Sequence, residues 1–136
     1  MIENSKTEFK REYNDKVNRV MLSFLNTDGG TLYIGIEDDG CILGINPQDV
    51  DDLLLKTANS FRDSVIPDPT GYISVSPIIR DNKTVIEVTV ERGEAIPYCF
   101  KSQGLVPRGV YVRVGNESVS ASYEHIRQMI SENSNG

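Results

Sequence analysis

The chain has 136 residues, of which 38% are hydrophobic and 25% are charged, and its formal net charge at pH 7 is −6. This length predicts one domain, residues 1–136, with a single core, and the composition excludes a disordered or fibrous chain. An acidic balance is unusual for proteins that bind nucleic acid, so such an activity requires a local cluster of basic side chains.

No apolar run approaches the roughly 20 residues that a membrane-spanning helix needs, and the first residues lack the order of a secretory signal peptide. We therefore expect a cytoplasmic protein. Cys41 and Cys99 lie far apart and outside any metal-ligand spacing, so both are expected to be buried, reduced thiols. His125 is the one histidine, and a histidine-based zinc site is not expected.

Hydrophobic spacing and turn residues predict the secondary structure. Apolar side chains at intervals of three and four indicate helices, and alternation indicates strands. Asp39-Gly40 is typical of a hairpin turn, Asn14 is the expected N-cap of the first helix, and Pro77 favours an edge strand. The predicted elements are a strand at 6–11, a helix at 14–26, a hairpin of 31–37 with 41–44, a helix at 47–65, strands at 72–79 and 84–90, an extended piece at 97–101, a strand at 110–114 and a helix after Ser120 or Ser122.

This order of elements predicts an α+β fold, with a mixed sheet and about three helices packed against it. In the first strand, Phe9 is expected to point inward, while Glu8 and Lys10 share the opposite face. Gly29 and Gly30 are expected to make the turn that lets helix and strand pack closely. Alanine at either position would cost about 1 kcal/mol or more if its φ angle is positive.

Common catalytic motifs are missing from the sequence. It contains no GxxxxGK[ST] phosphate loop, no GxGxxG after a strand, no HExxH and no GxSxG. Nucleotide hydrolysis, dinucleotide binding and triad hydrolysis therefore have no motif to support them.

Several segments in a fixed order nevertheless resemble a known family. Residues 3–10 are ENSKTEFK, and residues 24–40 are FLNTDGGTLYIGIEDDG. Together with Ile42-Leu43-Gly44, Pro97-Tyr98 and residues 111–115, YVRVG, they resemble the Schlafen AlbA-like domain over nearly the whole chain. Two positions depart from the usual pattern, because Asn4 stands where serine is common and Leu25 where alanine is common.

The resemblance implies a nucleic-acid-binding domain of a bacterial transcriptional regulator, which could be the N-terminal part of a longer protein. It also implies an alternative, because related Schlafen domains include RNA-cleaving ones with a site of three carboxylates. The matching positions are Glu3, Glu8 and Asp38. Such hard oxygen ligands suit Mg²⁺ or Mn²⁺ in a metal-dependent nuclease of RNA or single-stranded DNA, and otherwise no cofactor is expected. The structural alternative is that Glu3 belongs to a mobile chain end and that Asp38 only opens a turn.

Four basic residues are candidates for phosphate contact, namely Lys10, Arg11, Arg19 and Arg113. Lys10 is chosen because it shares a strand face with Glu8, and Arg113 because it lies in the matched YVRVG segment. An ordinary surface ion pair, such as Glu8 with Lys10, is an equally acceptable explanation for any one of them. A third function, a protein-interaction module that forms a homodimer, fits the acidic net charge.

Overall fold

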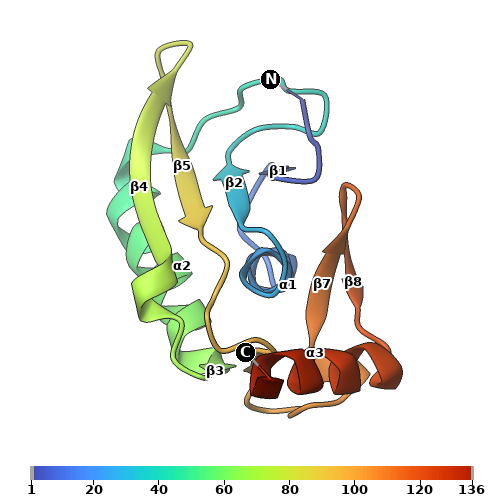
Figure 1. Cartoon of the computed structure of the whole chain (residues 1–136). Coiled ribbons are helices and arrows are strands. Elements are labelled where there is room, and N and C mark those ends of the chain that lie inside the picture. Colours follow the sequence, from blue (N-terminus) through green and yellow to red (C-terminus); the bar gives the residue numbers. More distant parts are fainter. Residues whose placement is uncertain (1, 136) are drawn as a thin grey trace.

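The computed structural model describes residues 2–135 and has a four-stranded mixed sheet at its centre (Figure 1). The first two strands of the order run parallel, and the other neighbours are antiparallel. This arrangement confirms the predicted α+β class, the hairpin near residue 81 and the edge position of the strand that contains Pro77. The strands, in spatial order, are β1 (Thr7–Lys10), β2 (Gly30–Ile34), β5 (Lys83–Val90) and β4 (Ile73–Arg80).

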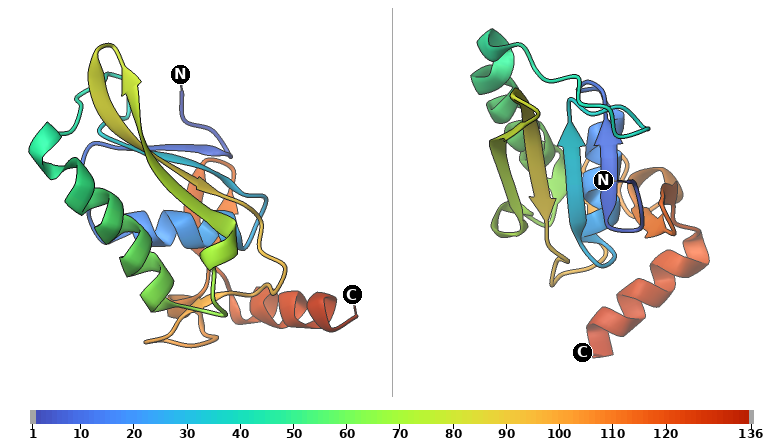
Figure 2. Two further views of the ribbon diagram at one scale, coloured as in Figure 1. Left: turned by 90° about the vertical axis from the view of Figure 1, so that its left-hand side faces the viewer. Right: turned by 90° about the horizontal axis from the view of Figure 1, so that it is seen from above.

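Three helices accompany the sheet, as predicted: α1 (Lys16–Leu25), α2 (Val50–Ser64) and α3 (Tyr123–Asn135). The first two cover the same face of the sheet, and apolar side chains from both join its strands in the main core (Figure 2). Asn14 Oδ1 accepts the backbone N–H of Lys16 at 2.9 Å and so caps the first turn of α1, although the formal N-cap residue is Asp15. No helix within residues 2–135 has both the length and the apolar character that a bilayer crossing requires.

Strand β1 is buried on both of its faces. Phe9 is fully buried against Ile36 and Val85, on the face away from α1. Glu8 is opposite Leu32 in the register with β2, and Leu32 belongs to the core beneath α1. The prediction that Phe9 points inward is therefore confirmed, while the opposite face carries a buried carboxylate that needs a partner.

Two predicted features near residue 40 need correction. Strand β2 ends at Ile34, and Gly35 turns the chain with a φ of +107°. The chain then turns at residues 38–40, as predicted, and folds back through a single bridge between Ile36 and Ile42, so residues 41–44 do not form the second strand of a hairpin. Both cysteines are free, as predicted, but only Cys99 is buried.

A second hairpin was missed by the sequence prediction. Strand β7 (Tyr111–Val114) pairs with β8 (Glu117–Ser120) and packs against α1, outside the main sheet (Figure 1). The turn between them, Gly115-Asn116, is a two-residue hairpin signal that was available in the sequence. A short pair, β3 (Val65–Ile66) with β6 (Cys99–Phe100), joins the end of α2 to the segment before β7.

The geometry of the turn between α1 and β2 predicts that Gly29→Ala lowers the free energy of unfolding. Gly29 has a φ of +75°, and a Cβ there would lie 2.8 Å from the carbonyl oxygen of Val90. We expect the free energy of unfolding to fall by about 1–3 kcal/mol in urea denaturation, because backbone strain and overlap add. Gly71→Ala is the control, since Gly71 has no atom within 4 Å of a built Cβ. Equal stability of the two variants would contradict this account of the turn.

Candidate nucleic-acid groove and its supporting ion pair

A buried ion pair connects the N-terminal strand to the β7–β8 hairpin. Arg113 Nη1 donates to Glu8 Oε1 at 2.8 Å and to Ser118 Oγ at 2.9 Å, while Nη2 donates to the carbonyl oxygen of Asn4 at 3.0 Å. The side chains of Arg113 and Glu8 are only 2% and 11% exposed. The guanidinium also lies 4.9 Å from the centre of the Phe24 ring on α1. One arginine therefore holds β1, α1 and both strands of the hairpin together.

This environment changes the role expected for Arg113. Its guanidinium is enclosed and engaged by Glu8, so it is not presented to a phosphate in this structure. Glu8 in turn pairs with Arg113 and not with Lys10, its neighbour on the strand face. A buried carboxylate without such a partner would be strongly unfavourable, so the contact between β1 and β7 stabilises the folded domain.

A groove lies between β1, α1 and the β7–β8 hairpin, beside the ion pair. Its main part has a volume of about 470 Å³, and an adjoining part of about 260 Å³ shares Arg19 and Tyr111 with it. We call the two parts together the basic groove. Its lining residues are Glu8, Lys10, Asp15, Lys16, Asn18, Arg19, Val20, Ser64, Phe100, Ser102, Gln103, Arg108, Tyr111, Asn116, Glu117, Ser118 and Val119.

The cations of the basic groove are uncommitted. Lys10, Lys16, Arg19 and Arg108 form none of the ion pairs found among residues 2–135. Arg19 lies 5.5 Å from the ring centre of Tyr111, a cation–π contact that leaves its charge unneutralised. The acidic lining residues are Glu8, which Arg113 neutralises, and Asp15 and Glu117. The groove is thus locally positive in an acidic chain.

The sequence identified only part of this cluster. Lys10 and Arg19 were predicted and lie in the groove, but Arg11 points elsewhere, with Nε 3.5 Å from Glu37 Oε1. Lys16 was missed, although it precedes Arg19 by three residues and so shares its side of α1. Arg108 was also missed, because it lies in a short 3₁₀ turn (Pro107–Gly109) that carries no periodic signal.

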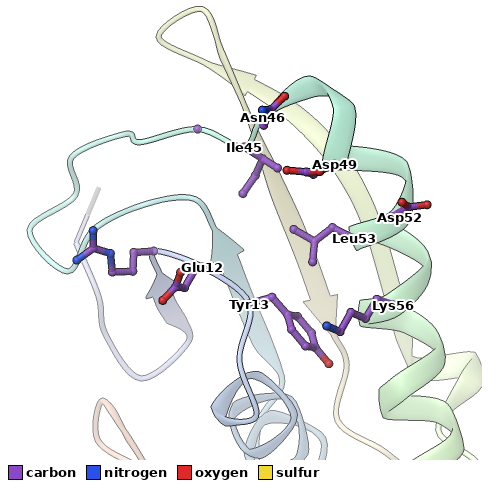
Figure 3. A pocket seen from close by; sticks show the side chains of 10 residues that line it. Glu12, Tyr13, Ile45, Asn46, Asp49, Asp52, Leu53 and Lys56 are labelled. Atoms are coloured by element: carbon purple, nitrogen blue, oxygen red, sulfur yellow. The ribbon is translucent and has the colours of Figure 1, made fainter.

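A separate cavity of about 400 Å³ lies between α2 and the segment after β1 (Figure 3). Tyr13, Ile45 and Leu53 form its apolar wall, and Lys56 Nζ lies 4.8 Å from the Tyr13 ring centre. Its three carboxylates outnumber its two cations, so it makes no case for phosphate binding. The charged residues are Arg11, Glu12, Asp49, Asp52 and Lys56.

The three carboxylates expected from the family resemblance approach one another. Burial, together with the nearby carboxyl groups of Glu8 and Asp38, raises the pKa of Glu3 from 4.5 to about 7. No group of three or more His, Cys, Asp or Glu among residues 2–135 is arranged to hold a metal ion, however. Glu8 is already engaged by Arg113. In this arrangement these residues therefore do not form a ready metal site.

Comparison with known proteins agrees with the family suggested by the sequence motifs. The profile of the Schlafen AlbA_2 family matches residues 3–122, and the chain belongs to that family. The DIP2311 protein from Corynebacterium diphtheriae matches with 19% identity and a TM-score of 0.63, over 86% of this chain and 22% of that one. The N-terminal domain of a RecG-related protein from Nitrosomonas europaea, whose name relates it to ATP-dependent DNA helicases, matches with 21% identity and a TM-score of 0.55, over 82% of this chain and 78% of that one. These two structures share the fold.

The ion pair predicts a large effect of Arg113→Met on stability. Loss of the guanidinium leaves Glu8 buried without a partner, so the free energy of unfolding should fall by about 3–5 kcal/mol. Denaturant unfolding monitored by circular dichroism measures it. Arg92→Met is the matched control, because Arg92 pairs with Asp28 at 3.7 Å on the surface and should contribute less than about 1 kcal/mol. A small loss in Arg113→Met, equal to the control, would contradict the structural role of the pair.

Proposed function

We propose that this domain binds nucleic acid through the basic groove. The observation that carries the proposal is the convergence of Lys10, Lys16, Arg19 and Arg108, all without ion-pair partners among residues 2–135, on one groove of a chain with a net charge of −6. Phosphate contacts supply most of the sequence-independent affinity of nucleic-acid binders, and they come chiefly from such side chains.

Neutral polar groups in the groove suit the same ligand. Ser102, Gln103 and Asn116 line it and carry donors that can reach phosphate oxygens or base edges. Membership of the Schlafen AlbA_2 family and the helicase-related neighbour support a nucleic-acid-related role. We further propose that the domain serves a larger bacterial regulator of transcription in the cytoplasm, in which other domains choose the sequence.

The groove predicts a binding defect on charge reversal. Lys16→Glu and Arg108→Glu should each weaken binding of a labelled oligonucleotide, measured by fluorescence anisotropy. Each should also make the slope of the logarithm of the binding constant against the logarithm of the salt concentration (the salt slope) about 1 less negative, because each removes one phosphate contact. The native domain should show a slope of roughly −3 between about 50 and 200 mM salt if all four cations contact phosphates.

Arg127→Glu is the matched control, because Arg127 is exposed on α3 outside the groove lining. It changes the net charge equally, so an equal loss would show that only overall charge matters. No binding of single- or double-stranded oligonucleotides at low salt would refute the proposed function. A stable dimer by light scattering together with that result would favour the protein-interaction module.

One observation favours a second function, a metal-dependent nuclease of RNA or single-stranded DNA. Glu3 lies close enough to Glu8 and Asp38 for their charges to raise its pKa. Carboxylates gathered in this way attract divalent cations, and Mg²⁺ or Mn²⁺ would relieve their mutual repulsion. Under this proposal Glu3 and Asp38 would adjust to receive the ion, since Glu8 is held by Arg113.

The titration of Glu3 provides a prediction with a definite sign. Its pKa is about 7 in the folded chain and 4.5 ordinarily, so the folded state holds the extra proton between these values. The free energy of unfolding therefore falls as pH rises through this window, and Glu3→Gln should be the more stable form at pH 8 and equal to the native chain below pH about 4.5. Carbon-detected NMR titration should show a midpoint near 7 for Glu3, lowered in Asp38→Asn.

Glu124→Gln on α3 is the control for that titration and should leave the Glu3 midpoint unchanged. Addition of Mg²⁺, which is diamagnetic, should lower the midpoint if the carboxylates bind the ion. Cleavage of structured RNA or single-stranded DNA should then depend on Mg²⁺ or Mn²⁺ and disappear in Glu3→Gln, which spares the Glu8–Arg113 pair. A midpoint unaffected by Mg²⁺, or cleavage that persists in Glu3→Gln, would exclude this site.

A further inference from the structure

Two aromatic rings lie in the basic groove among its cations. Tyr111 and Phe100 are both partly exposed, and both line the adjoining part of about 260 Å³. Their ring centres are 6.0 Å apart with an interplanar angle of 59°, so the rings do not stack flat on each other. Aromatic side chains placed this way offer an apolar surface inside the adjoining part, whose other lining residues are all polar.

The position of the rings follows from the fold. Phe100 comes from β6, which pairs with the strand after α2, and Tyr111 opens β7, which packs on α1. Arg19 reaches from α1 over the Tyr111 ring at 5.5 Å. Arg108 belongs to the same part of the groove. Cations that can hold a sugar-phosphate backbone therefore lie directly beside the rings.

Building on the proposed function, we propose that the groove takes single-stranded nucleic acid, with an unpaired base inserted against Tyr111 and Phe100. In a duplex the base faces are covered by their neighbours and only phosphates and base edges can be reached from outside. An aromatic surface recessed in a groove therefore cannot stack on the bases of a duplex. A single strand can turn a base out of its stack and place it on a ring, while its phosphates meet Lys16, Arg19 and Arg108.

The experiment compares four labelled probes in fluorescence anisotropy with the full chain. They are a single-stranded DNA, the RNA of the same sequence, the blunt DNA duplex, and a DNA strand of the same length in which several central nucleotides are abasic. The two intact strands should bind at least about tenfold more tightly than the duplex and the abasic strand, because the abasic strand keeps its phosphates but lacks the base to stack. The ratio of the affinities for the DNA strand and the RNA strand shows which sugar the groove prefers.

Variants of Tyr111 distinguish a loss of base stacking from a loss of the folded structure. Tyr111→Leu should weaken binding of the intact strand about tenfold and leave the abasic strand unaffected, while Tyr111→Phe keeps the ring and should retain binding. Tyr72→Leu is the matched control, because Tyr72 is a partly buried tyrosine that packs near Tyr98 and lies outside the groove. Thermal unfolding of each variant confirms that the folded domain is being compared.

The outcomes distinguish this inference from the function on which it rests. Equal binding of intact and abasic strands, or a duplex that binds as tightly as the single strand, would overturn base stacking while leaving phosphate binding intact. No binding of any probe at low salt would instead remove the proposed function itself. Loss of intact-strand binding in Tyr111→Phe as well as Tyr111→Leu would show that the ring is not the contact.

Discussion

The buried pair of Glu8 and Arg113 is the interaction on which the rest of the structure depends. Removing a carboxylate and a guanidinium from water costs hydration free energy, and this cost is offset only when both groups find good partners. Here the arginine meets a carboxylate, a hydroxyl, a carbonyl oxygen and an aromatic ring at once. These partners come from β1, the segment before it, β8 and α1, so the contacts of one side chain fix the relative positions of four segments.

The basic groove is a consequence of that arrangement. The β7–β8 hairpin is not a member of the main sheet, and it meets the rest of the domain mainly along α1 (Figure 1). The ion pair ties its strands to β1, and the space left between hairpin, helix and strand is the groove. Neutralisation of Glu8 by Arg113 also removes the one buried negative charge next to Lys10. The same contact therefore builds the walls of the groove and permits its positive character.

The charge distribution reconciles the acidic net charge of the chain with the nucleic-acid ligand that we propose. Net charge governs long-range repulsion, whereas affinity for phosphate depends on the local potential of the surface that meets it. The four groove cations lack ion-pair partners among residues 2–135, and two uncommitted carboxylates accompany them. The carboxyl groups of Glu3 and Asp38 are not among the groove lining, and Glu8, which lies near Glu3, is held by Arg113.

Local sequence patterns predicted much of the fold, but they did not predict the contacts between segments that are distant in the sequence. The three helices, the mixed sheet and the β4–β5 hairpin follow from hydrophobic spacing and turn residues. The burial of Arg113 could not be predicted, because its partner Glu8 is 105 residues away and both residues are usual on surfaces. The place of Lys16 in the groove could have been predicted from its spacing to Arg19. The places of Arg108 and Phe100 could not, because they depend on the path of a short 3₁₀ turn and of a two-residue strand.

The most direct test of this account is a map of where nucleic acid touches the domain. Titration of isotope-labelled protein with a short single-stranded oligonucleotide at low salt, followed by amide chemical shifts, locates the contact surface residue by residue. We predict that the largest changes fall on Lys16, Arg19, Arg108 and Tyr111, on both walls of the groove. Changes confined to the cavity beside α2, or to α3, would contradict the central claim that the groove built around Glu8 and Arg113 is the binding site.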